Sequence, residues 1–195
     1  VDLGGRRIIK TNILGGIAFL GAGENLLARN NVIRNAERGI YVGDTNLTPA
    51  NSRGISALKN SVRAISGIEH AIDINADAIP DNLIGPNTND ISDTDDGPND
   101  LLNHPIIYNA TDLGDDITRA DFFLDAPAGD YRIEFYQNSS IPASGHGPGE
   151  TYLEAHTITH TGSGVERFSV NLTDITTGDI ISSTATEIED PAGVD

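Results

Sequence analysis

Short apolar phrases separated by Asn and Gly recur through the first 85 residues of the chain. One such phrase begins at Asn12, Asn31, Ser61 and Asn82, at intervals of roughly 20 to 30 residues. A repeat of about that length, made of short apolar strands and polar corners, is typical of a β-solenoid, in which each copy forms one coil of a stack. We therefore expect residues 1–85 to form stacked coils.

Apolar positions alternate with other residues in a second phrase, which follows the first three copies. Because side chains of a strand point alternately to opposite faces, this pattern places one apolar set inside the stack. Coils about 4.8 Å apart align that set into an internal column. No apolar series at helical spacing survives ten residues, which disfavours amphipathic helices. The inward positions are Ile17 and Phe19, Ile40 and Val42, and Ile72 and Ile74.

Asparagine has a physical role at the corners, because it tolerates left-handed backbone geometry and hydrogen-bonds neighbouring backbone. Asn12, Asn31 and Asn82 are predicted to form a ladder up the stack, and Asn60 supplies the missing rung if the pairing slips by one residue. The polar segment 44–53 has turn composition and is predicted to be a loop that leaves the stack.

The composition changes at residue 86. Segment 86–109 is rich in Asp, Asn, Gly and Pro and is predicted to be a junction. Beyond it, apolar runs separated by Gly-containing turns predict an antiparallel β-sandwich in 110–195, with Tyr131, Ile133 and Phe135 on one face. The predicted strands cover 120–125, 131–136, 152–161, 166–172 and 180–188.

Two of the repeat phrases, NNVIRNAERGIYV (30–42) and NSVRAISGIEHAIDI (60–74), resemble the coils of right-handed parallel β-helix proteins. That family of secreted and surface proteins includes pectate lyases and alginate epimerases. The phrase NLIGPNTNDISDTDDGPNDLLNHPII (82–107) is similar to the segment that ends such helices in large surface proteins, and 110–195 resembles the immunoglobulin-like modules that follow.

The resemblance implies an all-β fold class with three parts. Residues 1–85 are expected to be the final coils of a right-handed parallel β-helix, 86–109 an acidic junction, and 110–195 an antiparallel immunoglobulin-like β-sandwich. It also implies an extracellular or cell-surface location.

The formal net charge of −17 is concentrated in the second half of the chain. Residues 1–85 carry +1, whereas residues 86–195 carry −18 with no Lys. Such a surface repels nucleic acid and anionic membranes, so we expect neither as a partner, and no segment approaches the ~18 apolar residues of a membrane span. Divalent-cation binding and adaptation to high salt both explain the acidity. With neither Cys nor Met, the chain has no disulfides and looks like a piece of a longer secreted or surface protein.

The acidic junction contains the best candidate for a metal site. Alternating Asp residues beside a Gly are how a loop folds carboxylates around Ca²⁺, which prefers six to eight oxygen ligands. The loop lacks the Glu that ends an EF-hand loop, and the alternative is a solvated acidic linker. The predicted Ca²⁺ ligands are Asp90, Asp93, Asp95, Asp96, Asn99 and Asp100.

Lys10, Arg29 and Lys59 each lie two residues before the repeat phrase, so they are predicted to stack as a strip. Cations at coil spacing repel one another unless they are solvated or share an anion. The strip therefore predicts contact with an acidic polysaccharide, and the alternative is three solvated side chains.

Enzymes of the β-helix family place a base beside carboxylates that neutralise a uronate. Tyr41 and Asp73 are predicted to face outward on adjacent coils, near Arg38, Glu69 and His70, but no motif of those enzymes is present.

His156 and His160 would form a metal pair on a helix. On the strand predicted here they lie about 13 Å apart and are expected to be surface residues.

These features predict a non-catalytic extracellular structural or adhesive module, stabilised by Ca²⁺ and contacting an acidic polysaccharide or other surface proteins. A fragment of a β-helix polysaccharide lyase or epimerase is the alternative.

Overall fold

The structure is a computed structural model that describes residues 8–10, 16–20, 27–34, 39–43, 54–63, 72–75, 86–141 and 145–188. In this part of the chain the fold is all-β, as predicted, with η2 (Pro98–Leu101) as the one short 3-10 turn. No described helix is long and apolar enough to cross a membrane. The predicted loop 44–53 lies outside the described residues.

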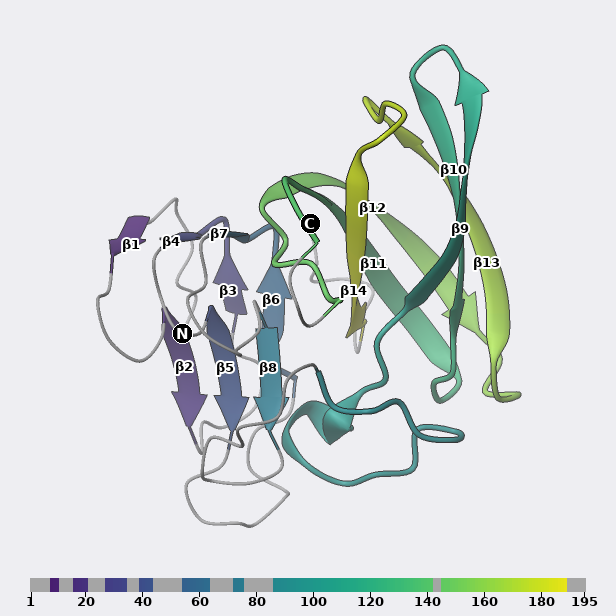
Figure 1. The fold of residues 1–195 in the computed structure, drawn as a ribbon. Coiled ribbons are helices and arrows are strands. Elements are labelled where there is room, and N and C mark those ends of the chain that lie inside the picture. The colour runs from purple at the N-terminus through teal and green to yellow at the C-terminus, as the bar shows by residue number, and fades with distance from the viewer. Residues whose placement is uncertain are drawn as a thin grey trace.

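The first eight strands form three small parallel sheets, with the orders β1-β4-β7, β2-β5-β8 and β3-β6 (Figure 1). The chain visits these sheets in one fixed order, returns through all three, and then re-enters the first two. The strands are β1 (Ile8–Lys10), β2 (Ile17–Leu20), β3 (Leu27–Arg29), β4 (Val32–Arg34), β5 (Ile40–Gly43), β6 (Ser56–Leu58), β7 (Ser61–Arg63) and β8 (Ile72–Asn75).

The predicted inward residues do align across strands. Ile17 pairs with Ile40, and Ile40 with Ile72, in the middle sheet, which confirms the register expected from the alternation. Side chains from all three parallel sheets join one buried cluster, because Ala28 of β3 and Ile33 of β4 pack with these residues. The three sheets therefore enclose a common core.

Two rungs of the predicted asparagine ladder, Asn31 and Asn60, come together with the one-residue slip. Val32 pairs with Ser61, so Asn31 lies opposite Asn60, and both are buried. The backbone N–H and the Nδ2 of Asn31 each donate to Asn60 Oδ1 at 3.0 Å. Asn60 Nδ2 in turn donates to the carbonyl of Ala28 at 2.8 Å. Asn12 and Asn82 lie outside the described residues.

The remaining strands form two antiparallel sheets, with the orders β13-β10-β9 and β12-β11-β14. The predicted runs of 110–195 are all strands, within a few residues at their ends. The predicted junction is too long, however, because β9 begins inside it. The strands are β9 (Ile106–Gly114), β10 (Ile117–Leu124), β11 (Gly129–Asn138), β12 (Thr151–His160), β13 (Glu166–Thr173) and β14 (Ile180–Glu187).

Both antiparallel sheets contribute to one apolar core. Tyr131, Ile133 and Phe135 of β11 are fully buried on a common face, as predicted. The ring of Phe135 meets that of Phe122, on β10 of the other sheet, edge to face at 5.8 Å. Aromatic pairs of this geometry add stabilisation beyond the area that they bury.

Candidate functional site

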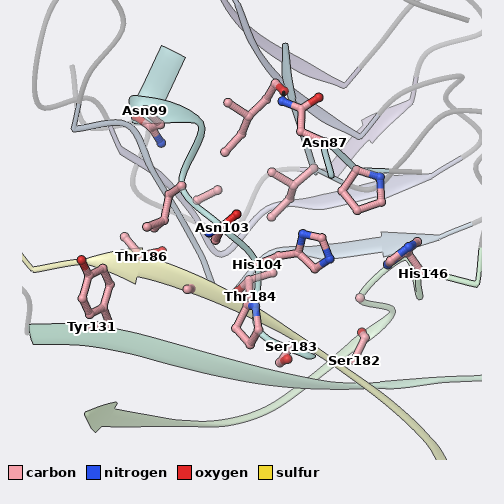
Figure 2. Close-up of a pocket in the computed structure, with 18 of the residues that line it drawn as sticks. Asn87, Asn99, Asn103, His104, Tyr131, His146, Ser182, Ser183, Thr184 and Thr186 are labelled. Carbon is pink, nitrogen blue, oxygen red and sulfur yellow. Dashed lines mark hydrogen bonds between the residues drawn. The ribbon is translucent and has the colours of Figure 1, made fainter. Parts of the chain in front are cut away.

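A cleft of about 780 Å³ lies between the parallel and the antiparallel sheets (Figure 2). One wall is made of apolar side chains from the last parallel strands, among them Val62 of β7 and Ile74 of β8. The opposite wall is the whole length of β14, and the segment after η2 closes one side. Concave, mainly apolar sites with a few polar groups are where proteins hold ligands.

The polar groups of the cleft do not form a catalytic set. The rings of His104 and His146 meet edge to face at 5.4 Å, and burial together with His146 lowers the pKa of His104 to about 4. His104 is therefore neutral at pH 7. The hydroxyl of Tyr131 donates to the carbonyl of Pro127 at 3.0 Å, and burial raises its pKa well above the ordinary value. No nucleophile hydrogen-bonded to a base is seen among the described residues that line the cleft.

The cleft is bridged by hydrogen bonds that close the free edges of the parallel sheets. At β7 the N–H of Val62 donates to the carbonyl of Gly149 at 3.0 Å, and Ser61 Oγ donates to the carbonyl of Glu150. At the start of β6 the side-chain amide of Asn99 accepts from the N–H of Ile55 at 2.8 Å and donates to its carbonyl at 2.7 Å. This pairing imitates a neighbouring strand.

The third parallel sheet is closed in the same way, since Asn87 Nδ2 donates to the carbonyl of Ile74 in β8. The last strand of each parallel sheet thus receives a partner from the second half of the chain. Unpaired strand edges are the usual site of unwanted association between β-proteins, and covering them prevents it.

A buried carboxylate holds the corner between β6 and β7. Glu134 of β11 is 0% exposed, and its Oε2 accepts from the backbone N–H of Lys59 at 2.8 Å and from the hydroxyl of Tyr136. Its Oε1 accepts from Arg132 Nε at 2.9 Å. Because a buried charge is tolerated only when paired and hydrogen-bonded, this network fixes β11 against the corner between β6 and β7.

The acidic loop is folded onto itself by side-chain amides. The Nδ2 of buried Asn103 donates to the carbonyls of Asp90 and Asp125, each at 2.9 Å, and its Oδ1 accepts from the N–H of Asp90. The Oδ2 of Asp90 accepts from the N–H and Oγ1 of Thr94, at 3.0 and 2.9 Å. These bonds bring the start of the loop against the end of β10.

Four carboxylates lie near one another in this region, and the pKa values of three of them reflect it. Burial, opposed by a backbone hydrogen bond and reinforced by its acidic neighbours, raises the pKa of Asp93 to about 6. Burial and the charge of Asp90 raise the pKa of Asp95, whereas a hydrogen bond from the backbone of Thr94 lowers that of Asp90. The fourth carboxylate is Asp125, which contributes to the shift at Asp93.

Some of the predicted Ca²⁺ ligands come together and others do not. Asp90, Asp93 and Asp95 lie close enough to influence one another, but Asn99 is turned away to the backbone of Ile55. No three acidic or histidine side chains of the described residues already converge on one point suited to a metal. The sequence did not predict a role for Asp125 or Asn103, because no local sequence pattern indicates that their side chains contact the acidic loop.

The predicted strip of Lys10, Arg29 and Lys59 is not formed, because the three residues do not share a sheet position. Lys10 pairs with Arg34 between β1 and β4, and Arg34 pairs with Arg63 of β7. Arg29 lies opposite Leu58, and Lys59 follows β6 at the corner. The basic residues that share a register position in the first parallel sheet are instead Lys10, Arg34 and Arg63.

Two further predictions are corrected by burial. Tyr41 does pair with Asp73 across β5 and β8, but Tyr41 is only 7% exposed. His160 is not a surface residue, since it is 1% exposed, with Nε2 at 3.1 Å from the carbonyl of Leu124. Arg38, Glu69 and His70 lie outside the described residues.

Comparison with known proteins finds no matching family model and no similar curated sequence. Function must therefore be inferred from the geometry of the chain.

Proposed function

We propose that this chain is a non-catalytic structural or adhesive module of an extracellular or cell-surface protein, in which the second half terminates a stack of coils. In this proposal residues 1–85 are the final coils of a right-handed parallel β-helix, and the antiparallel sheets form an immunoglobulin-like sandwich. The repeated order of the eight parallel strands and the common core of the two antiparallel sheets support it.

The observation that carries the proposal is the closure of all three parallel sheets. Backbone and amide groups from residues 87, 99, 149 and 150 pair with β6, β7 and β8. An arrangement in which the last strand of each parallel sheet is hydrogen-bonded to the second half of the chain serves stability and solubility.

Calcium and an acidic polysaccharide remain part of the proposal. Hard carboxylate oxygens in the acidic loop suit Ca²⁺. Arg34 and Arg63, which share a register position across β4 and β7, replace the predicted strip as the surface for a polyanion. Arg34 is exposed there, whereas Arg63 also donates to the carbonyl of Glu150 at 3.3 Å.

The alternative, a fragment of a polysaccharide lyase or epimerase, has only the pairing of Tyr41 with Asp73 in its favour. The burial of Tyr41 removes its hydroxyl from the reach of a polymer. We expect no unsaturated-uronate absorbance when the chain is incubated with alginate or pectate, and a clear signal would favour the alternative.

The direct test of the module is amide hydrogen exchange at the closed edges. The N–H groups of Ile55, Lys59 and Val62 are expected to exchange slowly, because each has a partner in the second half of the chain. Asn99→Ala should release Ile55 and leave Val62 protected. Fast exchange at all three amides in the wild-type chain would overturn the proposal.

A further inference from the structure

We infer that the acidic loop binds one Ca²⁺-like divalent cation through Asp90, Asp93, Asp95 and the distant Asp125, and that this cation fastens the loop to the end of β10. The inference deepens the calcium part of the proposed function. It differs from the set predicted from sequence, because Asp125 replaces Asp96, Asn99 and Asp100 as a ligand.

Asp125 is the observation that points to a ligand. Its side chain is 8% exposed, and its Oδ2 accepts a hydrogen bond from the N–H of Ser92 in the loop at 3.0 Å. The other oxygen, Oδ1, is buried and has no hydrogen-bond partner. A carboxylate oxygen taken out of water without a partner is strongly unfavourable unless a cation compensates it.

Asp90 supplies a second carboxylate oxygen without a hydrogen-bond partner. Asp90 Oδ1 is buried without a hydrogen-bond partner, while its Oδ2 is occupied by Thr94. Asn103 joins the two acids, since its Nδ2 donates to the backbone carbonyls of both Asp90 and Asp125. The backbones of the two residues that carry the open oxygens are thus held by one side-chain amide.

The surrounding charge is uniformly negative. None of the ion pairs found among the described residues involves Asp90, Asp93, Asp95 or Asp125. A divalent cation is the ligand that relieves repulsion between several buried carboxylates at once.

The donor set selects the class of cation. All of the side-chain donors are carboxylates, with backbone carbonyls and amide oxygens close by, and hard oxygen ligands suit Ca²⁺ rather than the softer transition metals. Since the carboxylates do not already converge on one point, binding must draw Asp93 and Asp95 inward. We therefore expect a Kd on the order of 10⁻⁴–10⁻³ M, as in extracellular calcium modules.

The test uses the full chain in thermal melts with EDTA, CaCl₂ or NaCl at matched ionic strength. At a Ca²⁺ concentration about twenty times the Kd, the Tm of the wild-type chain should rise by roughly 3–7 °C. NaCl alone should not reproduce this rise. Asp125→Asn should abolish it, whereas Asp96→Asn and the charge-matched hairpin control Asp115→Asn should keep it.

Terbium luminescence gives a second measurement that does not depend on unfolding. The charge of Asp93 acts on the hydroxyl of Tyr131, so that ring is placed to sensitise a bound Tb³⁺. We expect emission that Ca²⁺ displaces, with at least tenfold weaker binding in Asp93→Asn and unchanged binding in Asp115→Asn.

The outcomes separate cleanly. If Asp125→Asn does not fold, Asp93→Asn decides, and a full Ca²⁺ response in that variant overturns the inference. An equal response to NaCl, or an undiminished response in folded Asp125→Asn, also overturns it. If the inference is overturned in this way, slow exchange of the Ile55 and Val62 amides in EDTA would show that the module proposal stands without the cation site.

Discussion

Asn60→Ala is the substitution whose effect on stability can be worked out most directly. Asn60 is buried, and its side chain accepts two hydrogen bonds from Asn31 and donates one to the carbonyl of Ala28. Each bond contributes about 1 kcal/mol, and the buried groups left without a partner add a further penalty. We expect the free energy of unfolding to fall by about 3–5 kcal/mol.

That loss is a large fraction of the roughly 5–15 kcal/mol by which a protein is normally stable. For a chain of 195 residues it corresponds to a fall in Tm on the order of 10 °C. Urea titration followed by circular dichroism measures it, with Asn171→Ala on the exposed side of β13 as the matched control. The control should change stability by less than about 0.5 kcal/mol.

A double-mutant cycle sharpens the result. Because Asn31 and Asn60 share two of the bonds, Asn31→Ala combined with Asn60→Ala should lose much less than the sum of the two single losses. An Asn60→Ala variant within about 1 kcal/mol of the wild-type chain, or strictly additive losses, would refute the ladder as a stabilising element.

Three other perturbations test the interface and the cleft. Glu134→Ala should lower the free energy of unfolding by about 3–5 kcal/mol in urea titration, because it leaves buried donors unpaired, whereas Glu134→Gln should recover part of the loss. His104 contributes stability that is fully present above pH 6.5 and is lost as the pH falls towards its pKa of about 4, so His104→Gln should flatten the acid side of a Tm–pH profile. Asp93, whose pKa is raised to about 6, contributes stability that is lost as the pH rises through the same range. Because the wild-type chain and His104→Gln both contain Asp93, its contribution is the same in the two profiles. Gly147→Ala should lower the Tm, since its Cβ would lie 2.6 Å from Asn138 Nδ2, and an unchanged Tm would contradict the close packing there.

The parts of the fold that could be predicted from sequence are those governed by local periodicity. The alternation of Ile40 and Val42 set their inward orientation, because a strand has only two faces. The register between strands was less certain, since Asn31 aligned equally well with Ser61 or Asn60. Hydrogen bonding decided it, because a buried asparagine needs a partner for its amide.

The residues that join the two halves could not be predicted, because their roles depend on contacts distant in sequence. Glu134 lies between the inward-facing Ile133 and Phe135 on β11, so the alternation predicts that its side chain points outward into solvent. It is buried because the corner between β6 and β7 packs over that face and presents the N–H of Lys59. Asp125 similarly ends an ordinary strand and becomes a candidate ligand only when the acidic loop folds back against it.

The closure of β6, β7 and β8 has a consequence for the reach of the molecule. Among the described residues its bonds involve only the last strand of each parallel sheet, so in the proposed coil stack these contacts do not depend on the number of coils. Each added coil lengthens a stack by about 4.8 Å and leaves the terminating contacts untouched. Under the proposed function, the same terminal unit would therefore finish stacks of many lengths, with the length set by the number of coils.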